Sequence, residues 1–408
     1  MTSILFMKKL IVGISLIMLF LCGCYRNVDS PEFMPVILGS LPEKDVNTVT
    51  YPLVYKHEDI SGTGICMNVV SEIDEVENLS CRTIEFDMPL PQNALISDYC
   101  IYGDWVYYSY SYRDYIYGEL EYWYEKTEEE LNRQYASKLM RYNYVTGEII
   151  EIGSYTFSES IVDIEVSDNY FAYSRVIIEG NPQSQFGMEV KVVWEIMSIS
   201  TDGFEIIPLT EEAAMLTYLS LTGDNNIILY ECTDDETVTA VYKYNIESGI
   251  IECIYQGDVF NSITYSNGYV ILRNAENCFE IYDMNGNYII GFSSDLDEGD
   301  LYLCNVTCND ILCAWTILKY GTTFQVLVYD YSTDEVVALN AVSSVNSLEC
   351  ENNRVYFTGY SNYGIACYDI EEKSFCKNIY EKTQYELNKS LDGVLYGRFL
   401  LKFFCLVE

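Results

Sequence analysis

Basic residues and histidine are scarce in this chain. Its 408 residues include 23 Lys and Arg against 62 Asp and Glu, for a formal net charge of −39, and His57 is the single histidine. Binding to nucleic acid requires Lys and Arg to neutralise phosphates, so we expect no nucleic-acid partner. Histidine is the commonest general base and a frequent zinc ligand, so a histidine-based site would have to use His57.

Motifs of common enzymes and cofactor sites are also missing. The sequence has no GxSxG pattern for a serine nucleophile, no CxxC spacing and no phosphate-cradling loop. Asp283–Asn287 and Asp295–Asp300 superficially resemble calcium loops but lack the bidentate Glu at EF-hand spacing, which predicts solvated turns. We therefore name no catalytic residue, metal or cofactor, while the many carboxylates leave a glycosidase pair open.

The N-terminal apolar run is too short to cross a bilayer. Leu10–Leu21 has 12 residues, follows Lys8-Lys9 and precedes Cys22-Gly23-Cys24, which is the order of an export signal. Leu21-Cys22-Gly23-Cys24 resembles the lipobox of bacterial lipoproteins, although Cys22 is unusual at its position. The resemblance implies a signal peptide over residues 1–23, lipidation of Cys24 and anchoring to membrane lipid on the extracytoplasmic side. Ordinary secretion is the alternative.

Proline is rare, and half of the eight prolines gather just after Cys24, at Pro31, Pro35, Pro42 and Pro52. This composition predicts an extended tether over residues 24–48. An N-terminal arm packed along the domain is an equal alternative after Val46. Loss of Lys8 and Lys9 with the signal makes the mature chain more acidic still, so the lipid must do the anchoring.

Cysteine is abundant, at 15 residues, and 13 remain if Cys22 is removed and Cys24 is lipidated. An odd number cannot pair completely within one chain. Many lie in apolar strand-like runs, where a free thiol behaves as a small hydrophobic residue. These are Cys100, Cys253, Cys278, Cys313 and Cys367. We expect mostly free buried thiols, with one or more disulfides as the alternative.

The 39 Tyr and 17 Phe favour a strand-rich globular protein. Phe279–Tyr288 reads as a strand, a tight turn around Asp283 and Gly286, and a second strand. Degraded copies lie at Met140–Asn143, Ile196–Ser198, Tyr242–Asn245, Val328–Asp330 and Cys367–Asp369, about 38 to 55 residues apart.

A second repeated element precedes each copy: a polar turn that leads directly into an aromatic or aliphatic strand. Its seven copies begin at Gly103, Asp168, Asp224, Asn267, Asn309, Asn352 and Asp392. About four short strands fill one such repeat, which is typical of a β-propeller blade.

The two elements together resemble the divergent β-propellers of bacterial exported lipoproteins. The resemblance covers about residues 50 to 408 and implies an all-β fold, with a single β-propeller domain over residues 49–408. We predict seven blades, with eight as the alternative. The last copy is incomplete, so the N-terminal segment should supply its missing outer strand, from Ile65–Val70 or Cys81–Phe86.

The largest break in the repeat is Tyr110–Ser137, between the second and third strands of the first blade. Thr127 and Glu130 fit a capping box, which predicts a short helix. The insertion is rich in aromatic side chains, which stack on sugars or contact peptides. The alternative is that these side chains cover the blade or pack the helix. The candidate ligand-binding residues are Tyr110, Tyr112, Tyr115, Tyr117, Tyr122, Trp123 and Tyr124.

A smaller insertion, Ile178–Val190, lies in the neighbouring repeat and could line the same side. The hypothesis that follows is a monomeric, membrane-anchored, extracytoplasmic propeller that binds a protein, peptide or glycan. The alternatives are a carbohydrate-active enzyme with two opposed carboxylates, or a scaffold or assembly factor of the cell envelope.

Overall fold

A computed structural model gives the fold of the chain. It describes residues 48–51, 67–69, 74–75, 82–92, 94–112, 127–179, 189–200, 203–233, 237–273, 278–294, 301–319, 322–333, 335–340, 345–359, 365–380, 386–389, 391, 395–399 and 402–407. No helix among these residues is long and apolar enough to span a bilayer.

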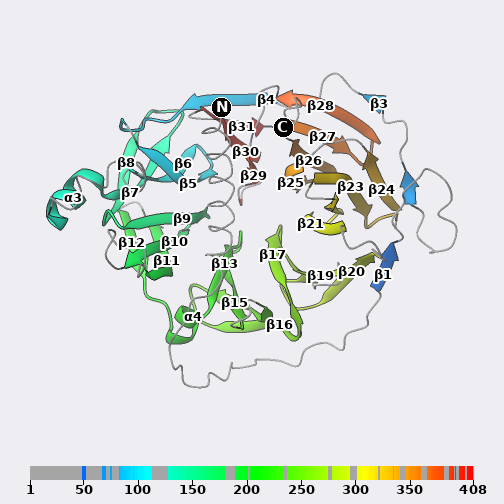
Figure 1. Cartoon of the computed structure of the whole chain (residues 1–408), viewed down its shortest axis with the longest axis horizontal. Helices are drawn as coiled ribbons and strands as arrows, with labels where there is room; N and C mark the ends of the chain where they lie inside the picture. The colour runs from blue at the N-terminus through cyan, green and yellow to red at the C-terminus, as the bar shows by residue number, and fades with distance from the viewer. Residues whose placement is uncertain are drawn as a thin grey trace, which may run out of the picture.

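The described strands form seven sheets arranged in a ring, so the all-β propeller prediction is confirmed (Figure 1). In each sheet, or blade, four antiparallel strands run in order from the axis to the rim. The first blade has β5 (Leu95–Tyr102), β6 (Trp105–Ser111), β7 (Ser137–Asn143) and β8 (Ile149–Tyr155), and the second has β9 (Glu159–Val166), β10 (Tyr170–Glu179), β11 (Glu189–Ser200) and β12 (Gly203–Ile207). The third has β13 (Thr217–Leu221), β14 (Asn226–Cys232), β15 (Val238–Asn245) and β16 (Ile251–Phe260), and the fourth has β17 (Ser262–Ser266), β18 (Tyr269–Arg273), β19 (Cys278–Asp283) and β20 (Tyr288–Ser294). The fifth has β21 (Leu301–Cys308), β22 (Leu312–Lys319), β23 (Thr322–Asp330) and β24 (Glu335–Asn340); the sixth has β25 (Val345–Glu351), β26 (Arg354–Gly359), β27 (Ile365–Asp369) and β28 (Ser374–Tyr380); and the seventh has β29 (Glu386–Lys389), β30 (Leu395–Phe399), β31 (Lys402–Val407) and β4 (Arg82–Asp87).

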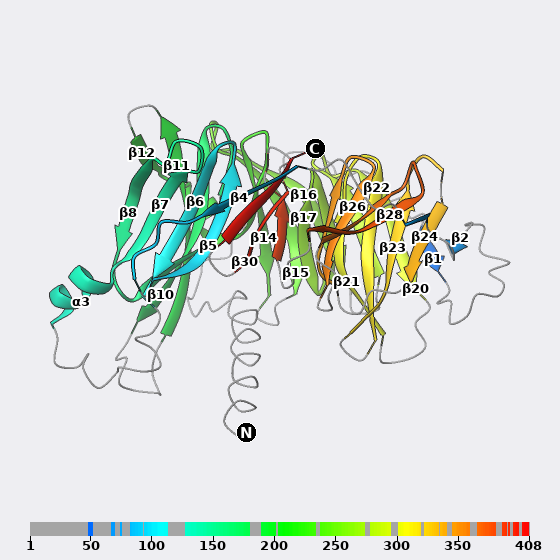
Figure 2. The same ribbon diagram turned by 90° about the horizontal axis from the view of Figure 1, so that it is seen from above.

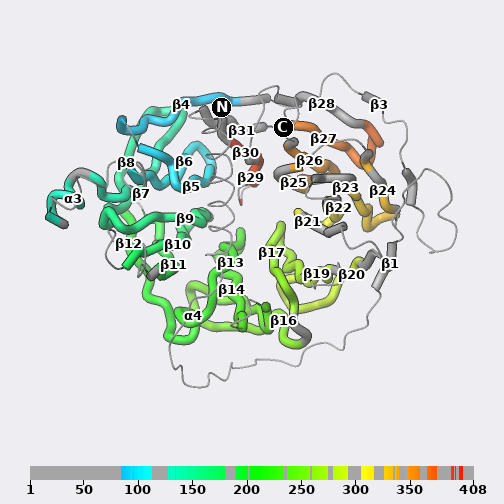
Figure 3. The backbone as a smooth tube through the Cα atoms, in the orientation of Figure 1, coloured from blue at the N-terminus to red at the C-terminus, as the bar shows by residue number. Residues whose placement is uncertain are grey.

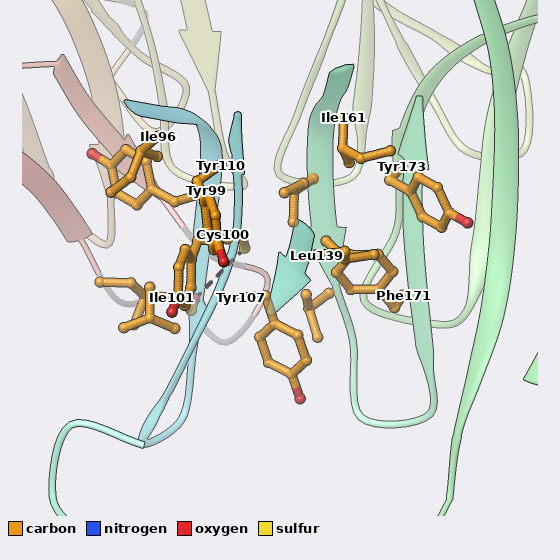
Figure 4. Close-up of a cluster of buried hydrophobic side chains, with 14 of the residues drawn as sticks. Ile96, Tyr99, Cys100, Ile101, Tyr107, Tyr110, Leu139, Ile161, Phe171 and Tyr173 are labelled. Carbon is orange, nitrogen blue, oxygen red and sulfur yellow. Dashed lines mark hydrogen bonds between the residues drawn. The ribbon is translucent and has the colours of Figure 1, made fainter. Parts of the chain in front are cut away.

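The hydrophobic core lies between consecutive blades. Separate clusters of buried side chains fill the spaces between the first and second blades, the second and third, and onward to the sixth. In the first cluster, Tyr107 of β6 packs on Phe171 of β10 with ring centroids 5.7 Å apart (Figure 4). Because each blade buries both of its faces, its strands carry apolar residues on both sides.

The repeated polar turns close the hairpins, as the sequence predicts. Asp283 Oδ1 accepts hydrogen bonds from the backbone N–H groups of Asn285 and Asn287, both at 2.8 Å, between β19 and β20. Gly286 has φ +80°, and a Cβ there would meet the Ile254 carbonyl oxygen at 2.7 Å, so glycine is required. This carboxylate serves the turn.

The N-terminal segment closes the ring, as expected, through one of its two candidate strands. β4 pairs with β31 in antiparallel register, Ile84 opposite Cys405, and so supplies the outer strand of the seventh blade. The Ile65–Val70 prediction is wrong for this purpose, because β2 (Met67–Val69) pairs with β24 of the fifth blade.

Figure 3 traces the ring of blades in the same orientation as Figure 1. Three short strands of the same N-terminal segment lie along the rim (Figure 1). β1 (Thr48–Tyr51), β2 and β3 (Asp74–Glu75) pair in parallel with β20, β24 and β28, on three successive blades. An exposed outer strand is a template for pairing with other chains, and this rim strap covers three such edges.

The described cysteines include both thiols and a disulfide-bonded residue. Cys100, Cys253, Cys308, Cys313, Cys350 and Cys367 form no disulfide, and five of these six are buried. Cys232, at the end of β14, is disulfide-bonded. Both expectations from the sequence therefore hold in part: free thiols fill the core and at least one disulfide is present.

Ring closure gives a direct test. The Phe86 ring of β4 stacks on Tyr144 of the first blade, with centroids 4.7 Å apart and planes at 9°. Phe86→Ala should lower the free energy of unfolding by about 2 kcal/mol, because a half-buried aromatic contact across the closure is lost. The measurement is urea denaturation followed by tyrosine fluorescence.

The neighbouring exposed residue provides the control. Asp87→Ala should change the free energy of unfolding by less than about 0.5 kcal/mol, because Asp87 is exposed. Equal losses from the two variants would contradict this account of closure.

Candidate ligand-binding face of the first and second blades

The structure places two of the seven predicted aromatic residues, and both pack against the protein. Tyr110 is 7% exposed and Tyr112 is half-buried. Tyr112 contacts Tyr110 and Tyr135 edge to face, with centroids 6.0 and 5.9 Å apart. Tyr115, Tyr117, Tyr122, Trp123 and Tyr124 lie outside the described residues. Tyr112 therefore links Tyr110 of β6 to Tyr135 at the far end of the insertion.

The helix predicted in the insertion is confirmed as α3 (Glu128–Tyr135). Thr127 is its N-cap, and the reciprocal bonds between Thr127 and Glu130 form a capping box. Asn132 Oδ1 accepts a hydrogen bond from the Phe157 backbone N–H at 2.8 Å, which joins the helix to the connection between the first two blades. Leu131 is 7% exposed beneath it. The helix is therefore attached to the scaffold through Leu131 and Asn132.

The second blade adds a long hairpin on the same side. β10 and β11 pair from Tyr170 opposite Ser198 to Glu179 opposite Glu189. Ile178 N donates to the Ser158 carbonyl at 3.1 Å, so the hairpin stays attached to the neighbouring connection. Figure 2 shows α3 and the far end of β10 on one side of the ring. The two insertions noted in the sequence therefore share one face, called here the loop face.

A charged network lies in the second blade near this face. The Arg175 guanidinium bonds Glu159 Oε1 at 2.6 Å and Glu195 Oε1 at 2.7 Å. The side chains are only 22%, 10% and 18% exposed. Burial lowers the pKa of Arg175, but Glu195 and Glu159 outweigh it and raise that pKa, so the cation is permanent.

Two tyrosines extend the network toward the first blade. The Tyr155 and Tyr173 hydroxyls are 2.8 Å apart, and Tyr173 donates to Glu195 Oε2 at 2.5 Å. Burial, together with the charge of Glu195, raises the pKa of both hydroxyls, so both stay protonated. Tyr173 and Arg175 therefore each hold one oxygen of the Glu195 carboxylate.

This network is suited to holding a surface rigid. Each carboxylate is occupied by the same guanidinium, and Glu159 Oε2 also accepts from the Thr156 N–H and hydroxyl, both at 2.7 Å. A glycosidase needs one carboxylic acid and one free carboxylate opposed across a sugar. The geometry of Glu159 and Glu195 instead supports positioning of the loops above.

Sequence reasoning identified the loop face but not this network. Its one available signal was Arg175, a basic residue inside the apolar strand Phe171–Ile178. A charge in such a run requires a partner. The partners lie 16 and 20 residues away on other strands, so only the fold could name them.

The innermost strands form a second polar region, the hub. Inner strands are sheet edges, and their free backbone N–H groups bond to side chains of the preceding blade. Asp98 Oδ2 accepts from Ile164 N at 2.8 Å, and a Glu165 carboxylate oxygen accepts from Leu221 N. The same role falls to Ser266, Thr307 and Ser347, which accept from Cys308, Cys350 and Leu387 at 3.1, 3.3 and 3.0 Å.

The face opposite the loop face carries the tight turns between strands, such as the turn at Asn267, and is called here the tight-turn face. Side-chain contacts on this face join several blades of the hub. Lys389 Nζ of the seventh blade bonds Asn267 Oδ1 at 2.8 Å and forms an ion pair with Glu351. Asn267 Nδ2 in turn bonds the Cys308 carbonyl at 2.8 Å. These contacts link four consecutive blades, from the fourth to the seventh.

Among the residues that the structure describes, no group of three or more His, Cys, Asp or Glu side chains is arranged to hold a metal ion. His57 lies outside those residues.

Comparison with known proteins supports no family assignment. No protein-family model matches the chain, and no curated protein matches it. Among solved structures, YCF48 bound to D1 peptide is 12% identical, covers 83% of this chain and 100% of its own, and gives a TM-score of 0.48. The β-propeller domain of the Trilobed protease from Pyrococcus furiosus is 14% identical, with coverages of 75% and 91% and a TM-score of 0.45. Saccharomyces cerevisiae Sqt1 is 11% identical, with coverages of 79% and 97% and a TM-score of 0.43. At these identities the likeness concerns the fold alone.

The carboxyl group of Glu349, on the inner strand β25, predicts that the free energy of unfolding depends on pH. Burial raises the pKa of Glu349 from 4.5 to about 7, although Lys389 lowers it. The folded state therefore holds a proton that the unfolded state loses above pH 4.5. The stabilisation is complete below pH 4.5 and is lost as pH rises through about 7, by at most about 3 kcal/mol.

Glu349→Gln removes this titration. The variant should lose less stability than the parent between pH 5 and pH 8, measured by urea denaturation at each pH. Glu148→Gln, on an exposed turn, is the control and should keep the parental slope. An unchanged slope in Glu349→Gln would show that Glu349 does not carry the effect.

Proposed function

We propose that this protein is a lipid-anchored, extracytoplasmic β-propeller that binds a protein, peptide or glycan on its loop face. The proposal rests on one observation, that both insertions are attached to the same connection between two blades. α3 and the β10–β11 hairpin rise on one side of the first two blades, and each is bonded to the connection between them. Insertions on a rigid scaffold are where binding function concentrates in repeat folds.

The Arg175 network supports binding over catalysis. It immobilises β9, β10 and β11 beneath the loops, and its carboxylates are engaged in ion pairs. A rigid base lowers the entropy lost when a ligand is bound. The aromatic residues Tyr115, Tyr117, Tyr122, Trp123 and Tyr124 lie in the sequence between Tyr112 and α3, so we assign the contacts with ligand to them.

The length of chain between Cys24 and the described fold supports a free loop face. Twenty-three residues separate Cys24 from β1, and β1 lies at the rim of the fourth blade, away from the first two blades (Figure 1). A segment of that length would span roughly 25 to 30 Å as a random coil, and more if its prolines keep it extended. Such a tether lets the protein stand off the membrane without using the loop face for attachment.

Lipidation is tested by substitution at the two neighbouring cysteines. Cys24→Ala should release the protein from the membrane fraction of a bacterial host and move it from the detergent phase to the aqueous phase on Triton X-114 separation, because the acyl attachment is lost. Cys22→Ala is the control and should remain in the detergent phase. Membrane retention of Cys24→Ala would overturn the anchor.

Ligand binding is tested on the full chain with two probes, a glycan array and an array of envelope-protein peptides. Trp123→Ala combined with Tyr124→Ala should weaken binding to any positive probe at least about tenfold, because loss of each aromatic contact costs on the order of 1 kcal/mol. Val145→Ser lies on the opposite face, at an exposed turn, and should bind as the parent does.

Two outcomes would contradict the binding proposal. One is loss of binding in Val145→Ser with retention in the aromatic variant, which would place the site on the tight-turn face. The other is hydrolysis of an array glycan by the parent, which would make the protein an enzyme.

A further inference from the structure

Two free cysteines face each other at the end of the fifth blade's inner hairpin. Cys308 ends β21, Cys313 is the second residue of β22, and the two are directly opposite in the antiparallel register. Residues opposite one another in such a pair place their side chains on the same face of the sheet. Both thiols are 0% exposed.

The turn between them determines how close they come. Asn309 N donates to the Leu312 carbonyl at 2.9 Å, so Asn309 and Leu312 form the hydrogen-bonded pair that closes the hairpin. Pairs alternate along an antiparallel ladder, so Cys308 and Cys313 are a non-hydrogen-bonded pair, with Cα atoms about 4.5 Å apart. That separation falls within the range that a disulfide spans, about 4.4 to 6.8 Å.

The surroundings select this pair over the third nearby thiol. Cys350 of the sixth blade is also buried, but its Sγ bonds the Thr307 carbonyl at 3.6 Å and its N–H bonds Thr307 Oγ1 at 3.3 Å. These contacts hold Cys350 to the backbone of the neighbouring blade. Cys308 and Cys313 have no such bond from their sulfur atoms among the described contacts.

The chain already contains a disulfide, at Cys232. Disulfides form and persist in oxidising compartments. A chain that carries one disulfide therefore folds where an oxidant is available to other cysteine pairs.

We propose that Cys308 and Cys313 form a disulfide across the β21–β22 hairpin when the chain folds under oxidising conditions. A small disulfide such as glutathione disulfide is the oxidant. One cysteine thiolate attacks it, releases one glutathione thiolate and forms a mixed disulfide. The second thiolate attacks the protein sulfur of that bond, closes the Cys308–Cys313 bond and releases the second glutathione. Two thiol protons pass to the two glutathione thiolates.

The step belongs to folding and not to the finished structure. Burial raises the pKa of both thiols, so the native protein contains almost no thiolate at either position and admits no oxidant. A two-residue turn brings the pair together early, while the hairpin is still accessible. The bond then fastens the end of the fifth blade where Asn267 of the fourth blade meets the Cys308 carbonyl.

The experiment compares two routes to the folded protein. Reduced, denatured full-length chain is refolded in glutathione disulfide and glutathione, and separately the reduced native protein is exposed to the same buffer. Remaining thiols are alkylated under denaturing conditions. Cleavage before Asp310 separates Cys308 from Cys313, so the crosslink appears in mass spectrometry as two peptides that part on reduction.

Refolding should yield the crosslinked peptides as the main form, with loss of alkylation at both positions, and the native protein should remain alkylated at both. Cys350→Ser should behave as the parent, whereas Cys313→Ser should restore alkylation of Cys308. Full alkylation of both residues after refolding of the parent would overturn the proposal, as would a Cys308–Cys350 crosslink. Because the parent alone decides these outcomes, a variant that fails to fold does not affect the test, and neither result bears on ligand binding.

Discussion

The free edge of each inner strand is the constraint on which the rest of this structure depends. An inner strand pairs on one side only, and its remaining backbone N–H groups face the axis, where an unpaired group is costly. The chain meets this need with an acceptor side chain at five of the junctions between blades, such as Asp98 for Ile164 and Ser266 for Cys308. At these junctions an inner strand is stabilised by the blade before it.

The outer edges are handled by a different device. The N-terminal segment covers three rim strands with β1, β2 and β3 before β4 completes the seventh blade. Backbone pairing protects those edges, and the Phe86 stack on Tyr144 joins the last blade to the first. Neither the rim pairing nor the Lys389 contacts involve α3 or the β10–β11 hairpin, the two elements that rise on the loop face.

The buried charged side chains of the second blade and of the hub hold neighbouring side chains in position. Arg175 holds two carboxylates in the second blade, and Lys389 ties Asn267 and Glu351 at the hub. In a chain with so few cations, each of these contacts removes a basic residue from the surface, which leaves the exterior strongly acidic. A formal net charge of −39 predicts a preference for neutral or cationic ligands over nucleic acid.

Much of the fold was determined by the sequence alone, because its evidence is local. Turn chemistry at Asp283 and Gly286, the alternation in Arg82–Phe86 and the capping box at Thr127 each involve residues a few positions apart, and the structure confirms all three. The choice of β4 over Ile65–Val70 for closure, the Glu159–Arg175–Glu195 network and the opposition of Cys308 to Cys313 near Cys350 were decided by the tertiary structure. These depend on which strands become neighbours in the ring, and neighbouring strands are chosen by packing and edge pairing across the whole chain, which no short stretch of sequence records.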